Sequence, residues 1–214
     1  MRDNNLITIL VDNDSWILPY AKKLVKKIEL MGFDSILLRS ADDIQPSWIN
    51  FMLGCTRIID EKILMHNKHN IVVHESDLPK GRGFAPMTWQ ILDGADKIPI
   101  CLIEAGAEAD VGDILIREEI FLNGFELCDE LRKLQGEKTI GMCLSFIENY
   151  QSIIKIKQIG VPSYYARRWP IDSRLDLNKT LVDQFDLLRV SDNERYPAFF
   201  EIGTQRYIIK IYKA

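Results

Sequence analysis

The chain has 214 residues, of which 47% are hydrophobic and 27% charged, which is typical of a soluble globular protein with one domain and a small appendage. Its net charge is −4 and its isoelectric point is near 5.5, so it lacks the basic surface that a nucleic-acid backbone requires. The apolar run at residues 6–12 is too short for a signal peptide or a membrane span. We therefore expect a cytoplasmic protein that binds neither nucleic acid nor a membrane.

The cysteines are scattered and form no CxxC pair, so nothing in their spacing indicates a disulfide framework or a metal site. Each of them is interpreted as a small, buried hydrophobic residue: Cys55, Cys101, Cys128 and Cys143. This usage is typical of a reduced compartment, and no metal is expected.

The predicted elements alternate along the first 150 residues. Short apolar runs predict strands at residues 6–12, 34–40, 49–54, 70–75, 97–105 and 113–120. Amphipathic spacing predicts helices at residues 15–30, 61–67 and 87–94, and a long helix at 123–150. Strands that alternate with helices indicate an α/β domain with a mostly parallel sheet.

The character of the chain changes after residue 151. Turn formers, aromatic residues and arginine dominate at first, followed by a predicted helix at 179–191 and a hairpin at 198–212 that turns at Gly203. We therefore expect a catalytic domain at 1–150 and, at 151–214, a C-terminal extension of loop, helix and β-hairpin. The apolar last strand of the hairpin favours a homodimer.

Two polar positions follow predicted strands. His74 ends the fourth strand before a loop rich in glycine and proline, and Asp110 lies in the loop after the fifth strand. Because ligands of open α/β sheets bind beyond the carboxyl ends of strands, we expect both at one edge, where the carboxylate would stabilise a charged imidazole. A hydrogen-bonded structural histidine and an aspartate of turn chemistry are the alternatives.

The surrounding residues resemble the signature of the folate-dependent formyltransferases. That pattern is a His, then Ser-Leu-Leu-Pro, Arg-Gly, Ala-Pro, a Trp-containing helix and later Asp-x-Gly-Asp-Ile. The matching residues occur in the same order and spacing: His74, Ser76-Asp77-Leu78-Pro79, Arg82-Gly83, Ala85-Pro86, Trp89 and Asp110-Val111-Gly112-Asp113-Ile114. The resemblance covers most of the chain and implies a Rossmann-like formyltransferase domain.

The resemblance implies formyl transfer from N10-formyltetrahydrofolate to an amine. His74 would stabilise the oxyanion and protonate the folate nitrogen, while Asp110 would hold His74 and accept or relay the proton of the amine. The folate would contact the following residues: Met52, Leu53, Gly54, Ile103, Glu104, Ala105, Gly106 and Asp110.

The sequence of the C-terminal part narrows the choice of acceptor substrate. "SYYARRWPIDSRLD" and "FDLLRVSDNERYPAFF" resemble the sugar-nucleotide N-formyltransferases of 4-amino-sugar and pseudaminic-acid pathways in bacterial surface-glycan (lipopolysaccharide) synthesis, which are related to methionyl-tRNA formyltransferase. A UDP- or dTDP-linked 4-amino-4,6-dideoxy sugar is the expected acceptor, and the acidic isoelectric point and the short tail favour it over tRNA. Its binding residues are expected to be Ser76, Lys80, Gly81, Arg82, Gly83, Tyr164, Arg168, Arg189, Asn193 and Tyr196.

One position departs from the family pattern. The family has an oxyanion-binding asparagine two residues before the histidine, where this chain has Val72. The nearest asparagine, Asn70, would lie roughly 13 Å from His74 along an extended strand. Two other readings stay open, a formyltransferase acting on another amine such as an aminoacyl group and a non-catalytic folate- or sugar-nucleotide-binding protein. A dinucleotide-dependent oxidoreductase is excluded, because the loop after the first strand has no glycine.

Overall fold

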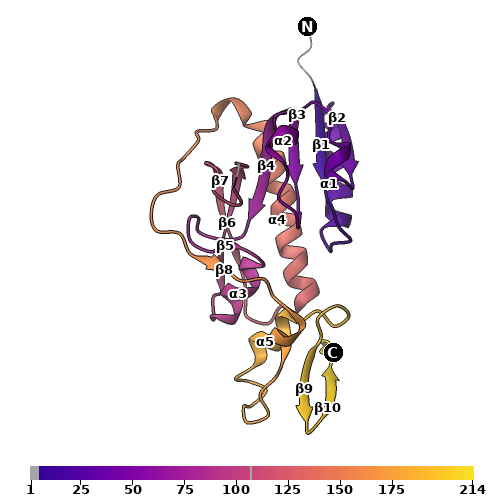
Figure 1. Cartoon of the computed structure of the whole chain (residues 1–214), viewed down its shortest axis with the longest axis vertical. Coiled ribbons are helices and arrows are strands. Elements are labelled where there is room, and N and C mark those ends of the chain that lie inside the picture. The colour runs from indigo at the N-terminus through magenta and orange to yellow at the C-terminus, as the bar shows by residue number, and fades with distance from the viewer. Residues whose placement is uncertain (1–4, 107) are drawn as a thin grey trace.

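The computed structural model describes residues 5–106 and 108–214 of the chain. The strands and α-helices follow in this order: β1 (Leu6–Leu10), α1 (Leu18–Leu30), β2 (Asp34–Leu38), β3 (Ser47–Met52), α2 (Glu61–Leu64), β4 (Asn67–His74), β5 (Arg82–Gly83), α3 (Pro86–Leu92), β6 (Lys97–Glu104), β7 (Ile114–Phe121), α4 (Cys128–Glu148), β8 (Tyr164–Tyr165), α5 (Phe185–Val190), β9 (Ala198–Ile202) and β10 (Gln205–Ile209). Figure 1 shows the central sheet at one end of the molecule and the β9–β10 hairpin at the other. The predicted α/β class is confirmed.

The central sheet has the order β2-β1-β3-β4-β6-β7 and is mostly parallel, as predicted. β1 to β4 pair in parallel, whereas β6 runs antiparallel to both β4 and β7. A short connection explains the reversal. The seven residues of α3 rise only about 10 Å, whereas the eight residues of β4 extend about 26 Å, so the chain re-enters the sheet beside the carboxyl end of β4.

One face of the sheet packs against α1 and α4. In α1 the buried residues are Ala21, Leu24 and Ile28, at the helical spacing that forms one apolar stripe. They cover β-strand residues such as Ile9 and Phe51, which are fully buried. Leu30, at the end of this helix, is exposed, because it lies half a turn away from Ala21 and Ile28 on the helix.

The opposite face carries a buried row of polar side chains across three strands. Thr8 of β1 donates to Asn50 of β3 (3.0 Å), and Asn50 donates to Asn70 of β4 (3.4 Å). Asn70 also accepts from Asn67 (3.0 Å) and donates to the Leu64 carbonyl (2.8 Å). These bonds satisfy polar groups that would otherwise destabilise the core.

A strap, residues 153–166, connects α4 to the C-terminal part. Figure 1 shows it in orange, passing around the edge of the sheet to reach β5. It is held at one end by two backbone hydrogen bonds between Ile114 and Ile156 (2.8 and 2.9 Å) and at the other by parallel pairing of β8 with β5. Because pairing partners far apart in sequence leave no local pattern, neither short strand was predicted.

The C-terminal part contains a shorter helix than predicted and the expected hairpin. The predicted helix begins at residue 179, but α5 begins at Phe185, since Thr180 and Asp183 bond to each other (2.6 Å) and to each other's backbone amides. The hairpin turns at Gly203, which has a positive φ of 58°. No helix in the described part of the chain is long and apolar enough to span a membrane.

Candidate active site

His74, the last residue of β4, is buried and faces an acceptor on each side of its ring. Nε2 lies 2.8 Å from the carbonyl oxygen of Gly81, and Nδ1 lies 3.5 Å from Oδ1 of Asp110. The other carboxylate oxygen of Asp110 accepts a hydrogen bond from the backbone amide of Gly83 (2.9 Å). Two acceptors stabilise an imidazolium with a proton on each nitrogen, the form that can both bind an oxyanion and give up a proton.

Asp110 reaches His74 for a different reason from the one we predicted. Because β6 is antiparallel to β4, its carboxyl end lies beside Ile71 rather than beside His74. The loop after β6 therefore folds back toward His74, and Asp110 adopts a left-handed backbone (φ 59°) within it. The expected neighbourhood of the two residues is confirmed, but the shared-edge argument for it is wrong.

This loop is fixed from two directions. Gln158 of the strap donates to the carbonyls of Asp110 and Gly112, at 2.8 Å in each case. On the other side the loop packs directly on β6, since a Cβ on Gly112 would lie 1.4 Å from the carbonyl oxygen of Glu104. The carboxylate is thus held in place by main-chain contacts. Residue 107, within the predicted folate-binding loop, lies outside the described residues.

The glycine-rich loop after His74 packs against the strap. A Cβ on Gly83 would lie 2.4 Å from the carbonyl oxygen of Tyr165, and Gly83 has a φ of 100°. The amide of Gly81 donates to Ser163 (2.9 Å). Two predicted acceptor-binding residues, Gly81 and Gly83, therefore shape the His74–Asp110 site through their backbone groups, and their glycine character is explained by the strap.

A cavity of about 430 Å³, called the main cavity here, opens beside this pair. It is lined by His74 and Gly83 and by most of the residues predicted for folate: Met52, Leu53, Gly54, Ile103, Ala105, Gly106 and Asp110. Sequence reasoning missed several further walls: Asn13, Ser15, Trp16 and Ile17 after β1, residues 55–59 after β3, Glu75, Phe84, Gln135 and Thr139. The loops after β1 and β3 could have been found, because they follow parallel strands at the same edge.

Glu104 does not line either of the cavities described here, contrary to the prediction that it contacts folate. Its carboxylate lies 2.9 Å from Nδ1 of His69, 3.3 Å from Lys155 and 2.9 Å from the amide of Asn70. Burial alone would raise the pKa of Glu104, but the hydrogen bonds from His69 and Asn70 outweigh it and hold that pKa below its usual value. Glu104 is therefore part of a structural network.

A second cavity of about 270 Å³, called the side cavity here, lies between α3, α4 and the C-terminal part. Of the predicted acceptor residues it is lined by Arg168 and Tyr196, together with the unpredicted cations Arg132 and Arg167 and the ring of Trp169. It shares four wall residues with the main cavity: Trp16, Phe84, Ala85 and Gln135. The two cavities are thus adjacent.

Arg168 has donor capacity to spare in this cavity. Its NH2 group donates to the Asp172 carbonyl (3.1 Å) and to Ser173 (3.3 Å), whereas its buried Nε has no partner. Burial lowers the pKa of Arg168, so an anion brought next to it would restore the interactions that its charge lost with water.

Seven predicted acceptor residues line neither cavity: Ser76, Lys80, Gly81, Arg82, Tyr164, Arg189 and Asn193. The NH2 group of Arg82 donates to Gln158 (2.6 Å) and so braces the strap. Tyr164 is 68% exposed, while its neighbour Tyr165 stacks on Trp89. Trp89 has a structural role, through this stacking and its hydrogen bond to the Ala166 carbonyl (2.8 Å).

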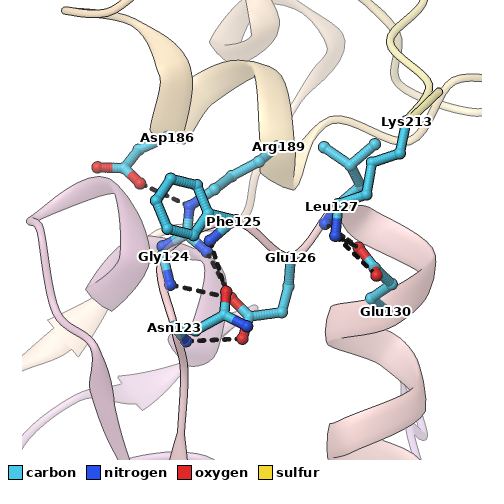
Figure 2. A network of polar contacts seen from close by, with 9 residues as sticks. All are labelled: Asn123, Gly124, Phe125, Glu126, Leu127, Glu130, Asp186, Arg189 and Lys213. Atoms are coloured by element: carbon cyan, nitrogen blue, oxygen red, sulfur yellow. Dashed lines mark hydrogen bonds and ion pairs between the residues drawn. The ribbon is translucent and has the colours of Figure 1, made fainter.

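Arg189 and Asn193 were also predicted to bind the acceptor, and both have structural contacts instead. Figure 2 shows Arg189 between Asp186 (2.6 Å) and Glu126 (3.5 Å), where it ties α5 to the loop before α4. The side chain of Asn193 exchanges two hydrogen bonds with the backbone of Ile211 (2.8 and 3.1 Å). Neither residue lines the side cavity.

The missing oxyanion donor is not replaced by Asn70. The amide of Asn70 is buried and bonded within the polar row behind α2, whereas Val72 lines the main cavity at the position where the family has an asparagine. Val72 offers no hydrogen-bond donor in its side chain. Along this wall, the Asp110 carboxylate lies 3.5 Å from Nδ1 of His74, and Glu75 lines the same cavity.

The thiols contribute no nucleophile to either cavity. Burial raises the pKa of Cys55, in the main cavity, to about 12, and that of Cys128, in the side cavity, to about 11. Both are therefore protonated near neutrality. In residues 5–106 and 108–214, no group of three or more His, Cys, Asp or Glu side chains is arranged to hold a metal ion.

Comparison with known sequences finds relatives that match part of the chain. No protein-family model matches it. Methionyl-tRNA formyltransferase of Ehrlichia canis (strain Jake) is 31% identical over 123 residues, which make up 57% of this chain and 40% of that protein. The corresponding enzyme of Rickettsia prowazekii (strain Madrid E) is 30% identical over 112 residues, 52% of this chain and 37% of that protein. The chain thus spans about two fifths of the length of these curated relatives.

Comparison with solved structures covers nearly the whole chain. Methionyl-tRNA formyltransferase from Clostridium thermocellum superposes with a TM-score of 0.81 and 21% identity, over 98% of this chain and 92% of that one. A 4-N formyltransferase from Francisella tularensis gives 0.70 and 19%, over 98% of both chains. HypX from Aquifex aeolicus in complex with tetrahydrofolic acid gives 0.80 and 14%, over 96% of this chain and 37% of that one. The shared feature is the fold.

Proposed function

We propose that this chain, which has the fold of the formyltransferases, transfers a formyl group from N10-formyltetrahydrofolate to a primary amine. The observation that supports this most directly is the His74–Asp110 pair, 3.5 Å apart and open to a cavity of about 430 Å³. A buried imidazole and carboxylate beside a cavity are the groups that acyl transfer requires.

The walls of the main cavity fit a pterin. Met52 and Ile103 offer apolar surface, and the backbone at Gly54, Ala105 and Gly106 offers amide and carbonyl groups that can pair with the edge of the ring. Bound there, N10-formyltetrahydrofolate would supply a formyl group on a nitrogen that leaves as an amine. We infer no role for a metal.

The roles of the two residues follow from their contacts. Charged His74 donates a hydrogen bond to the formyl oxygen as negative charge develops on it and returns a proton to the leaving nitrogen. Asp110, fixed by the Gly83 amide, keeps the ring oriented and its charged form stable. Since Nδ1 stays with Asp110, Nε2 exchanges the Gly81 carbonyl for the substrate.

We further propose that the acceptor amine is carried by a nucleotide-linked amino sugar. The side cavity supports this, since Arg167 and Arg168 can meet a diphosphate, while Trp169 and Tyr196 can stack on a base. Arg132 lines the same cavity but is already paired with Asp192 (2.7 Å). It adjoins the main cavity through shared walls, so one extended ligand could reach from the arginines to His74. UDP- and dTDP-linked 4-amino sugars of surface-glycan synthesis are the acceptors we favour.

Methionyl-tRNA is the competing acceptor, because the curated relatives are methionyl-tRNA formyltransferases. A net charge of −4 argues against a polyanionic partner. The two acceptors are separated by offering both in one assay.

The test is a turnover assay that follows release of tetrahydrofolate from N10-formyltetrahydrofolate. Acceptors would be a panel of UDP- and dTDP-linked 4-amino sugars, the matching 4-hydroxy sugars, and methionyl-tRNA. We expect release only with an amino sugar, lost in His74→Ala and retained in the matched variant His66→Ala, since His66 is exposed and outside both cavities. Turnover with methionyl-tRNA alone would contradict the sugar assignment, and no turnover with any amine would contradict formyl transfer.

A further inference from the structure

Glu75, the residue after His74, brings a second carboxylate to the main cavity. Its side chain lines the cavity together with His74, Asp110 and Gln135. The charges of His74 and Asp110 both act on its carboxylate. The formyltransferase pattern assigned no role to this position, so its presence beside the reacting groups calls for a chemical explanation.

Asp110 is poorly placed to accept a proton. One of its oxygens accepts from the Gly83 amide (2.9 Å), and the other faces Nδ1 of His74. Protonating Asp110 would remove the negative charge that stabilises charged His74 at the moment when the imidazolium must bind the oxyanion. A proton acceptor distinct from Asp110 avoids this conflict.

We propose that Glu75 binds the amino group of the acceptor and takes the proton which that nitrogen loses on attack. With His74 charged and Glu75 ionised, Glu75 and Asp110 leave one net negative charge in the site, and the charges of Arg57 and Glu108, which also line the cavity, offset each other. This net charge favours the ammonium form in which an alkyl amine arrives at neutral pH. The inference rests on the proposed formyl transfer and deepens it by assigning the base.

The acceptor nitrogen loses two protons in this reaction, and the folate nitrogen gains one. The ammonium first gives one proton to the Glu75 carboxylate, which passes it to water. The nitrogen lone pair then forms a bond to the formyl carbon, and the carbonyl electron pair moves to the oxygen beside His74. The second proton lost from nitrogen goes to Glu75. As the carbonyl reforms, the bond to the folate nitrogen breaks, and that nitrogen takes its proton from His74, which is reprotonated through water from Glu75.

The surroundings of Glu75 suit this role. Burial raises the pKa of Glu75, while the charge of His74 and the hydrogen bond from Gln135 partly oppose the rise. A carboxylate with a raised pKa is a stronger base than an exposed one. Asp110 acts in the same direction as burial, since its negative charge also disfavours a charged Glu75.

The experiment compares Glu75→Gln and Glu75→Asp with the wild-type chain, using the amino sugar that the wild type turns over. We expect Glu75→Gln to lower kcat by about 10²-fold or more, with little change in the KM for N10-formyltetrahydrofolate. Its remaining activity should rise steadily with pH, because only amine already neutral in solution can react. Glu75→Asp should restore part of the loss. An unchanged pH profile, or a kcat in Glu75→Gln within about threefold of wild type, would overturn the proposal.

A second measurement is independent of turnover and separates this inference from the proposed function. If the wild type formylates no amine, the proposed function fails, and the free energy of unfolding of wild type and Glu75→Gln is then compared between pH 4 and pH 8. A carboxyl whose pKa is raised by folding stabilises the fold at acid pH and loses that contribution as the pH rises through its folded pKa. The wild type should therefore lose stability relative to Glu75→Gln as the pH rises, and a difference independent of pH would overturn a titrating base at this position.

Discussion

β4 contains two histidines, and each of them faces a carboxylate at the end of β6 or in the loop after it. The surroundings of the two pairs differ. His69 lies 2.9 Å from Glu104, and its other nitrogen lies 2.7 Å from the hydroxyl of Tyr150. His74 lies 3.5 Å from Asp110, and its other nitrogen faces the Gly81 carbonyl. The first pair is closed by side chains, with the ring packed edge-to-face on Phe146 and Tyr150, whereas the second opens into the main cavity.

The difference shows that a histidine–carboxylate pair has no function by itself. What separates the two is the third neighbour of the ring, which is packed aromatic side chains for His69 and a cavity wall for His74. His66, exposed just before β4, is the reference that has neither environment. The three histidines therefore form a matched set of the same residue type in three environments.

The largest effect is expected for His74→Ala. It should reduce formyl transfer by about 10²–10⁴-fold, because the oxyanion loses a charged donor and the leaving nitrogen its acid. The midpoint of thermal unfolding should stay close to that of the wild type, since the ring borders a cavity. Turnover is measured at saturating acceptor, with unfolding followed by circular dichroism. Retained activity in a folded variant would remove His74 from the mechanism.

His69→Ala should lower the stability of the protein and leave its activity nearly unchanged. Loss of a buried ring leaves Glu104 and Tyr150 without their partner and creates a cavity, which should lower the free energy of unfolding by about 2–4 kcal/mol. Activity per folded molecule at low temperature should be nearly unchanged. Denaturant unfolding together with an active-site titration checks both. A fall in kcat without a loss of stability would contradict a structural role for the His69–Glu104 pair.

Glu104→Gln tests the His69–Glu104 pair through the pH dependence of the free energy of unfolding. The pKa of Glu104 is lowered in the folded protein, so its carboxylate stabilises the fold at pH values above the unfolded pKa and loses that contribution as the pH falls through the folded pKa. The wild type should exceed Glu104→Gln in stability by about 1–2 kcal/mol at neutral pH, and the gap should shrink on acidification. Unfolding curves from pH 3 to pH 7 give the answer, and a constant gap would contradict an ionic role.

The smallest effect belongs to His66→Ala. Its side chain is exposed and lines neither of the two cavities described here, so the changes in stability and in the activation free energy should lie within the usual range for a surface substitution, about 0.5 kcal/mol. This variant is also the control for His74→Ala and His69→Ala. A clear loss of activity would indicate that the surface near the start of β4 takes part in binding.

Sequence patterns correctly predicted the local features of this protein. Apolar runs located all six strands of the central sheet, glycine marked the hairpin turn, and the order of His74, the glycine-rich loop and Asp110 indicated the site. These features are readable because each depends on neighbours within a few residues, through strand alternation, helical spacing or turn chemistry. The homodimer and the division at residue 150 stay predictions.

Only the tertiary structure decided which distant residues share a site. The reversal of β6, which forces the Asp110 loop to fold back, depends on how far α3 can carry the chain. Arg189 is buried and pairs with Glu126 from another segment, whereas Arg132 of α4 pairs with Asp192 at the wall of the side cavity. An arginine looks the same in sequence whether it is buried with its carboxylate or borders a cavity, because packing between segments far apart along the chain determines its surroundings.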